Sequence, residues 1–308
     1  MQWIGSRDKY FCLIQKPAFE VTECFANYID KGKILTSFKS QEAIIAPNST
    51  LQLDSIIYVG PQKTELLSAV DPSFSQIVYF GKLDPIVRTM MSLLRFIHKV
   101  VPNWGICILI LSICIFSVLY PFTQKSLRSM KRLQALQPEM EQLRAKYKDE
   151  PQKLNKEVME LYKTNKVNPF GGCLPLFFQM PVFFSLYQTL MRSIELKGAA
   201  FLWIKDLSEP DRLFVLQKAL PFIGKDINLL PLLMAAAMAV SQKLTMARSG
   251  ASGPAAEQQK MMAVIFPILF AFIFYTFPSG LALYWFSYTM LTMVSQLRMN
   301  AVKGEARG

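Results

Sequence analysis

The chain has 308 residues, of which 52% are hydrophobic and only 18% charged, and its formal net charge is +12. Soluble domains have about 45 to 50% apolar and about 25% charged residues, so the composition excludes a simple cytosolic enzyme. The single histidine, His98, argues against a multi-histidine metal site, and we expect no cofactor and no catalytic residues. The five cysteines do not form a disulfide framework, although Cys12 and Cys24 could pair if this part of the chain lies outside the cytoplasm.

Residues 1–84 are expected to form a small β domain or the end of a larger one. Two short runs rich in β-forming residues occur at 55–59 and 76–80. Residues typical of turns lie around them at 46–49, 60–61 and 71–72. Apolar residues then recur at helical spacing from Pro85 to Val101, with basic residues elsewhere on the wheel. This pattern predicts an amphipathic helix at 85–102, which either packs on a domain or lies at a membrane interface.

Five apolar stretches follow. Residues 103–122 contain no charged side chain, and their length matches the roughly 20 residues that cross a hydrocarbon core. The other four stretches are 170–191, 227–246, 261–277 and 281–297. The sequence therefore predicts a mostly α, polytopic membrane protein with a five-span core over residues 103–300 and a short tail at 301–308. The turn at 278–280 predicts that the last two spans form an antiparallel pair.

The basic residues predict the orientation of the spans. Segment 123–168 holds eleven Lys and Arg residues, whereas segment 192–226 holds six. The excess of positive charge on the cytoplasmic side of membrane proteins places the first segment and the tail inside, and the second segment and the turn at 278–280 outside. By the same count the β domain lies outside. Because no export signal or earlier span precedes it, we expect the chain to be N-terminally truncated.

The spans offer neutral polar groups rather than acids or bases. Apart from Lys243, their interiors contain no Asp, Glu, His, Lys or Arg, which argues against an intramembrane protease or a proton-coupled pump. Polar side chains include Ser112, Gln179, Gln188 and a helical stripe formed by Trp285, Tyr288, Thr292 and Ser295. These groups either hold the helices together by hydrogen bonds or line a wet groove that could host a polypeptide, and the sequence leaves both readings open.

Segment 123–168 predicts a cytoplasmic helical hairpin, with a first arm of about two dozen residues ending near 149–151. It is either a solvated linker that sets topology or a basic docking arm for an anionic partner such as RNA, acidic protein or lipid headgroups. The candidate docking residues are Arg128, Lys131, Arg132, Arg144 and Lys146. Only Tyr147 and Tyr162 could stack on bases, so no sequence-specific binding of nucleic acid is expected.

Several motifs occur in a characteristic order: 103–105 (Asn-Trp-Gly), 120–121 (Tyr-Pro), 136–138 (Leu-Gln-Pro), 166–175 (Lys-Val-Asn-Pro-Phe-Gly-Gly-Cys-Leu-Pro), 179–181 (Gln-Met-Pro) and 277–280 (Phe-Pro-Ser-Gly). In these motifs the chain resembles the YidC membrane protein insertases, the bacterial branch of the group that includes the mitochondrial Oxa insertase. The resemblance implies an inner-membrane insertase and chaperone, with residues 1–84 as the C-terminal part of a periplasmic β-sandwich domain. A small-solute channel or transporter is the alternative.

The resemblance also implies roles for individual residues. A hydrophilic groove, open to the cytoplasm and lipid, would receive the translocated part of a client, and an aromatic slide would deliver its apolar segment to lipid. The implied groove residues are Ser112, Phe116, Gln179 and Gln188, and the implied slide residues are Tyr284, Trp285, Tyr288 and Thr292. Many family members carry an arginine where this chain has Phe116. The implied partners are nascent membrane proteins, the ribosome and signal recognition pathway, the Sec translocon and the phospholipid bilayer.

Overall fold

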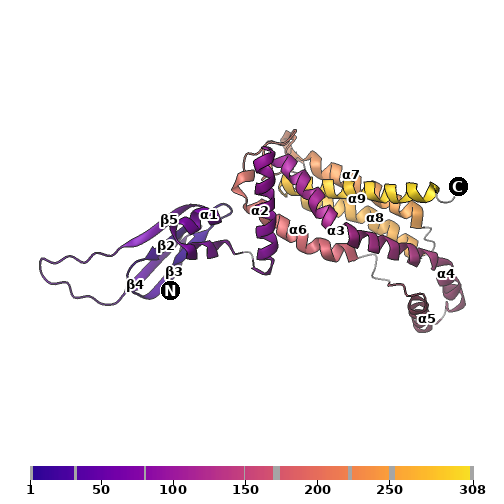
Figure 1. Cartoon of the computed structure of the whole chain (residues 1–308), viewed down its shortest axis with the longest axis horizontal. Helices are drawn as coiled ribbons and strands as arrows, with labels where there is room; N and C mark the ends of the chain where they lie inside the picture. Colours follow the sequence, from indigo (N-terminus) through magenta and orange to yellow (C-terminus); the bar gives the residue numbers. More distant parts are fainter. Residues whose placement is uncertain are drawn as a thin grey trace. The chain divides into compact units, whose positions relative to one another are not determined.

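The computed structural model describes residues 3–30, 33–79, 81–148, 150–168, 174–220, 224–249 and 254–305. The chain divides into two compact units. The first comprises residues 1–84 with 192–194, and the second comprises residues 85–191 with 195–308. Strands dominate the first unit and helices dominate the second (Figure 1).

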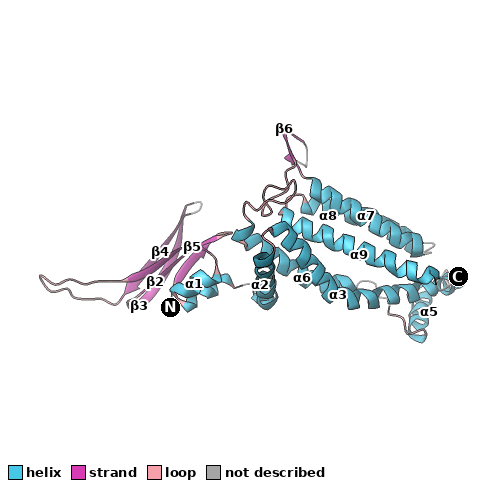
Figure 2. Cartoon of the chain, turned by 45° about the horizontal axis from the view of Figure 1, so that its top comes forward, coloured by secondary structure: helices cyan, strands magenta, loops and turns pink. Residues whose placement is uncertain are grey.

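The strand-containing unit has two small antiparallel sheets (Figure 2). Strands β1 (Ile4–Arg7), β2 (Phe11–Pro17) and β5 (Ser55–Pro61) form one sheet in the order β1-β2-β5, and β3 (Val21–Asp30) pairs with β4 (Lys33–Ser40). Helix α1 (Thr64–Val70) and the 3-10 helices η1 (Pro72–Val78) and η2 (Gly81–Leu83) follow. Ile14, Leu67 and Phe74 are completely buried, so the core of the unit lies between the sheet and this helical segment.

Two expectations for this unit are wrong. The run at 76–78 forms the end of η1 rather than a strand, because the Asp71 carboxylate accepts a hydrogen bond from Ser73 N (2.9 Å) and Pro72 follows with its φ fixed in the helical range. Phe80, the last residue of the predicted run, lies outside the described residues. Residues 60–61 end β5 instead of forming a turn, and a proline at the end of a strand costs no ladder hydrogen bond. Cys12 and Cys24 lie in different sheets, and both are free thiols.

Asp71 has the largest described shift of a carboxyl pKa in this unit. Its ion pair with Lys16, together with hydrogen bonds from Ser73, lowers the pKa of Asp71 to about 2, against an ordinary value of 3.8. A carboxyl with a depressed folded-state pKa stabilises the fold above pH about 3.8, and that contribution is lost as the pH falls toward about 2. We expect Lys16→Met to raise the Asp71 pKa toward 3.8, as read from the pH titration of its carboxyl carbon by NMR. Lys39→Met, which removes a pair with Glu23, is the matched control, and an unchanged Asp71 pKa in Lys16→Met would contradict the assignment.

The second unit is built from long helices. Their bounds are α2 (Asp84–Val100), α3 (Trp104–Ala135), α4 (Gln137–Lys146), α5 (Pro151–Thr164), α6 (Leu174–Arg192), α7 (Leu229–Ser249), α8 (Pro254–Phe274) and α9 (Ser279–Glu305). Between α6 and α7 lie the 3-10 helix η4 (Ile194–Leu196) and the strand pair β6 (Phe214–Leu220) and β7 (Gly224–Ile227). Among the described residues, Trp104–Ser126 is the one helical segment long and apolar enough to cross a bilayer, and Leu229–Leu244 and Lys260–Phe274 are shorter apolar helices.

Helices α3, α6, α7, α8 and α9 lie side by side in both views (Figures 1 and 2). Helix α7 packs with α8 and α9, and α3 packs with α9. One apolar core joins them to α2, whose buried positions Met90, Leu94 and Ile97 recur every three or four residues. Helix α2 ends ahead of Pro102, within two residues of the predicted boundary.

Helix α3 is longer than the predicted span. It continues through Pro121 to Ala135, so the first predicted arm of the hairpin is the end of α3 followed by α4, with a break at Leu136. A proline inside a helix removes one hydrogen bond and can be accommodated, whereas Pro138 falls in the first turn of α4, where its missing N–H costs nothing. Asp149, near the predicted end of the arm, is outside the described residues. Helices α4 and α5 contact each other, and Tyr162 Oη lies 3.3 Å from Met140 Sδ.

Candidate functional site

A neutral polar contact lies between α6 and α9, inside the helical unit. Gln179 Nε2 on α6 donates a hydrogen bond of 3.0 Å to Tyr284 Oη on α9, although the two residues are 105 positions apart. Gln179 is 5% exposed and Tyr284 is completely buried. The structure thus joins a residue assigned to the groove with one assigned to the slide.

Helix α3 adds an aromatic contact to this region. Phe116 is half-buried, and its ring centroid lies 6.0 Å from that of Tyr288 in an edge-on arrangement. Tyr288 in turn lies 6.0 Å from the Tyr284 ring. Ser112, one turn before Phe116, is completely buried and donates its hydroxyl to the Ile108 carbonyl at 2.7 Å. We call Ser112, Phe116, Gln179, Tyr284 and Tyr288 the polar core cluster.

The remaining predicted groove and slide residues lie elsewhere on the same helices. Gln188 is half-buried and nine positions after Gln179 on α6, which is about 13 Å along the helix. Trp285 packs among aromatic rings of α6 and α8, with centroid distances of 5.4 Å to Phe183 and 5.2 Å to Phe270. Thr292 donates its hydroxyl to the Tyr288 carbonyl at 2.9 Å, within its own helix.

Helices α3, α6 and α9 also carry buried polar atoms that have no hydrogen-bond partner among the described residues. They are Gln124 Nε2 on α3, Gln179 Oε1 and Ser185 Oγ on α6, and Ser295 Oγ on α9. Buried polar groups almost always find a partner, so water or a bound polar molecule is expected to satisfy them. They occur on the three helices that carry the polar core cluster. These atoms can therefore offer hydrogen bonds to a polar guest.

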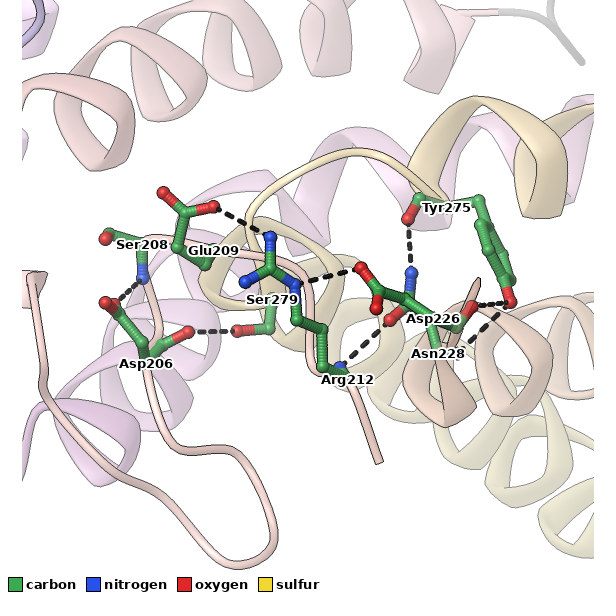
Figure 3. A network of polar contacts seen from close by, with 8 residues as sticks. All are labelled: Asp206, Ser208, Glu209, Arg212, Asp226, Asn228, Tyr275 and Ser279. Carbon is green, nitrogen blue, oxygen red and sulfur yellow. Dashed lines mark hydrogen bonds and ion pairs between the residues drawn. The ribbon is translucent and has the colours of Figure 1, made fainter. Parts of the chain in front are cut away.

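A second polar network ties the segment before α7 to the turn between α8 and α9 (Figure 3). Ser279 N and Gly280 N donate to the Glu209 and Leu207 carbonyls at 2.8 and 2.9 Å. Asn228 Nδ2 donates to the Tyr275 carbonyl at 2.7 Å, and Arg212 forms an ion pair with Asp226 at 3.1 Å and another with Glu209 at 3.6 Å (Figure 3). The two segments that the positive-inside rule assigns to the outer side are thus hydrogen-bonded to each other.

Asp211 closes the N-terminus of α7. Its Oδ2 accepts hydrogen bonds from Leu229 N, Leu230 N and Trp203 Nε1 at 2.8, 2.9 and 3.1 Å, and its side chain is nearly completely buried. A carboxylate is favoured at this position because a helix N-terminus carries unpaired N–H groups and a partial positive charge. Sequence reasoning missed this residue and the β6–β7 pair, because segment 192–226 was treated as a loop. Asn228 directly before the apolar run was the available signal for a helix start.

The predicted docking cations are divided between two helices. Arg128 and Arg132 are exposed on α3, and Arg144 and Lys146 lie on α4, while the side chain of Lys131 is outside the described part of the structure. Lys146 Nζ and Lys153 Nζ lie 5.2 and 5.1 Å from the centre of the Tyr147 ring. On the facing helix, burial raises the pKa of the Tyr162 hydroxyl. Residues 169–173 of the longest sequence motif fall outside the described residues.

Comparisons with known proteins agree with this architecture. Residues 96–306 match the family model described as 60Kd inner membrane protein, and residues 1–93 match the YidC periplasmic domain. The fold is also similar to a solved structure described as an active YidC insertase with its first transmembrane domain resolved. The TM-score is 0.55 at 21% identity, covering 94% of this chain and 70% of that one.

The helical unit, the strand-containing unit and these matches together define the class, which is a mostly helical bacterial inner-membrane protein with a periplasmic domain. The chain belongs to the 60Kd inner membrane protein family. It is 39% identical over 302 residues to the membrane protein insertase YidC of Pelobacter propionicus and 35% identical over 300 residues to that of Geobacter metallireducens. These alignments cover 97% of this chain but 54% and 52% of the relatives, so the chain spans about half of their length.

Proposed function

We propose that this protein is a membrane protein insertase and chaperone, which lets the polar part of a nascent protein enter a hydrophilic groove among α3, α6 and α9. The observation that carries the proposal is the set of buried, unpartnered polar atoms on these three helices. In hydrocarbon each unsatisfied backbone group costs several kcal/mol, so an interior that supplies hydrogen bonds shortens the unfavourable path of a polar segment. The curated relatives carry the name of such an insertase.

The proposal includes a topology. Helices α3, α6, α7, α8 and α9 are the five spans, the β6–β7 side faces the periplasm, and the α4–α5 hairpin and the C-terminal end of α9 face the cytoplasm of the inner-membrane protein. The hydrogen bonds between the two segments assigned to the outer side support this arrangement, and Figure 2 draws β6 at one end of the helical unit and α5 and the C-terminus at the other. The exposed cations of α3 and α4 would then dock a ribosome or targeting receptor, and the Sec translocon would be a further partner.

Site-specific crosslinking of a stalled nascent single-span protein tests the insertase proposal. A photoreactive residue replaces either Ser112, which is buried in the polar core cluster, or its neighbour Ile113, which is 50% exposed on the other side of α3. We expect the translocated tail to crosslink at position 112 and the control at 113 to capture mainly lipid. Crosslinking at neither position, together with conductance or solute uptake by the purified protein in liposomes, would favour a channel instead.

Phe116 provides a test of electrostatics in the same assay. Phe116→Arg is expected to be tolerated, because the guanidinium can stack on the faces of Tyr120 and Tyr288, whose rings lie 5.6 and 6.0 Å from the native ring. The added charge is expected to increase insertion of clients with acidic tails several-fold, since a charge partly buried among helices is less screened than one in bulk water. Insertion is measured across a series of tail charges, with Phe116→Leu as the control. A response that does not depend on tail charge would refute this electrostatic role.

A further inference from the structure

An apolar cavity of about 390 Å³ lies between α2, α3 and α6. Its lining includes Pro85, Thr89 and Leu93 from α2, Leu111 and Val118 from α3, and Val182 from α6. Thr89 supplies the one hydroxyl among these residues, and this hydroxyl already donates to the Pro85 carbonyl of its own helix at 2.8 Å. The wall therefore favours an apolar occupant, because a polar one would lose its hydrogen bonds to water.

The cavity suits a slender apolar occupant. Its lining comes from three helices, so a hydrocarbon chain that enters it would be shielded from water on several sides. A thin, unbranched hydrocarbon chain does fit, and the cavity opens beside Val118, which is 70% exposed.

The surface of α2 around the cavity has two faces. Exposed apolar residues, Phe96 at 65% and Val100 at 74%, continue the cavity face along the helix. Arg88, Arg95 and Lys99 follow one another at helical spacing on the other side. Among the described residues, Asp84 lies in the first turn of α2, and Glu195 pairs with Arg95 at 3.4 Å. Lys99 is exposed, and a cation on a helix that lines an apolar cavity complements a molecule with a hydrocarbon tail and an anionic head.

We propose that this cavity is a binding site for one acyl chain of an anionic phospholipid, whose phosphate lies near the basic face of α2. The proposal requires that α3 crosses the bilayer, as proposed above, but it does not require that the protein inserts clients. A bound lipid would fill the gap between α2 and α3 and hold α2 against the helical unit.

Native mass spectrometry of the delipidated full chain tests this site. The protein is titrated with phosphatidylglycerol and, separately, with phosphatidylcholine of the same acyl chains. We expect one saturable phosphatidylglycerol adduct, which Thr89→Trp weakens at least about tenfold by filling the cavity, because each methylene that loses its burial is worth about fourfold in affinity. Ile113→Trp, which adds the same side chain at an exposed position of α3 that does not line the cavity, is expected to leave binding unchanged. Lys99→Gln is expected to reduce the preference for the anionic lipid about fivefold.

Val118→Trp fills the same cavity from α3 and replaces Thr89→Trp if that variant does not fold. Unchanged adduct formation in the cavity-filling variant, or equal binding of the two lipids, would overturn the proposal. Crosslinking of a client, rather than of lipid, to a photoreactive residue at position 89 would also overturn it. Loss of insertion with lipid binding intact would count against the proposed insertase function alone.

Discussion

Gly105→Ala is expected to destabilise the helical unit more than any other single methyl addition at a described glycine. A Cβ at position 105 would lie 2.1 and 2.2 Å from Cγ and Cδ2 of Phe201, far inside van der Waals contact. Rotation of the Phe201 ring does not relieve the clash, because the Cβ of Phe201 would also lie only 2.5 Å from the added methyl group. Overpacking of this kind costs about 1 to 3 kcal/mol or more. The free energy of unfolding in mixed micelles with increasing dodecyl sulfate measures the loss.

A second substitution tests whether the clash with Phe201 causes the loss of stability, rather than alanine at position 105 in itself. Phe201→Ala in the Gly105→Ala background is expected to recover part of the loss, since the methyl group would then occupy the space of the ring. Gly198→Ala is the comparison, because a Cβ there meets nothing within 4 Å and only its φ of +73° is unfavourable. Wild-type stability of Gly105→Ala would show that α3 and the segment around Phe201 are not packed as described.

Asp211→Ala is expected to cost about 3 kcal/mol of unfolding free energy, because the carboxylate caps α7 and its hydrogen bonds are charged ones. Its removal leaves Leu229 N, Leu230 N and Trp203 Nε1 without their acceptor. Hydrogen exchange should accelerate most in the first turn of α7. Asp211→Asn retains an acceptor oxygen and is expected to lose less.

Asp226→Ala is the matched control for Asp211. It removes an aspartate from the same region, but Asp226 pairs with Arg212 where both side chains are more than a third exposed, so the expected cost is under about 1 kcal/mol. Equal losses in the Asp211 and Asp226 variants would contradict the capping role.

The spacing of apolar residues and the lack of charged residues predicted where two helices lie. The apolar spacing from Pro85 to Val101 predicted α2 to within two residues, and the uncharged stretch 103–122 predicted the start of α3. The change from apolar to polar residues near 122 did not mark the end of α3, because the helix continues through polar residues to Ala135. The run at 76–78 was misassigned because capping by Asp71 overrides its β propensity.

The contacts that define the candidate site depend on distant residues. Gln179 meets Tyr284 across 105 positions, and Ser279 meets the Asp206 carbonyl across 73 positions. Each residue was visible as a polar side chain, but its partner depends on how the helices pack. The division into groove and slide came from the family resemblance, and it stays a prediction. The structure adds that Tyr284, assigned to the slide, is buried and bonded to the groove residue Gln179.

The length of α3 has a mechanical consequence. Its 32 residues extend about 48 Å, whereas the hydrocarbon core is about 30 Å thick. Ser112 and Phe116 therefore lie on the same helix as Arg128 and Arg132, with Pro121 between the two pairs. A force applied at the α4 end of this helix would act as on a lever whose other end is held where Phe201 lies against Gly105. A small tilt at that end would then move Phe116 relative to Tyr288, whose ring it contacts at 6.0 Å.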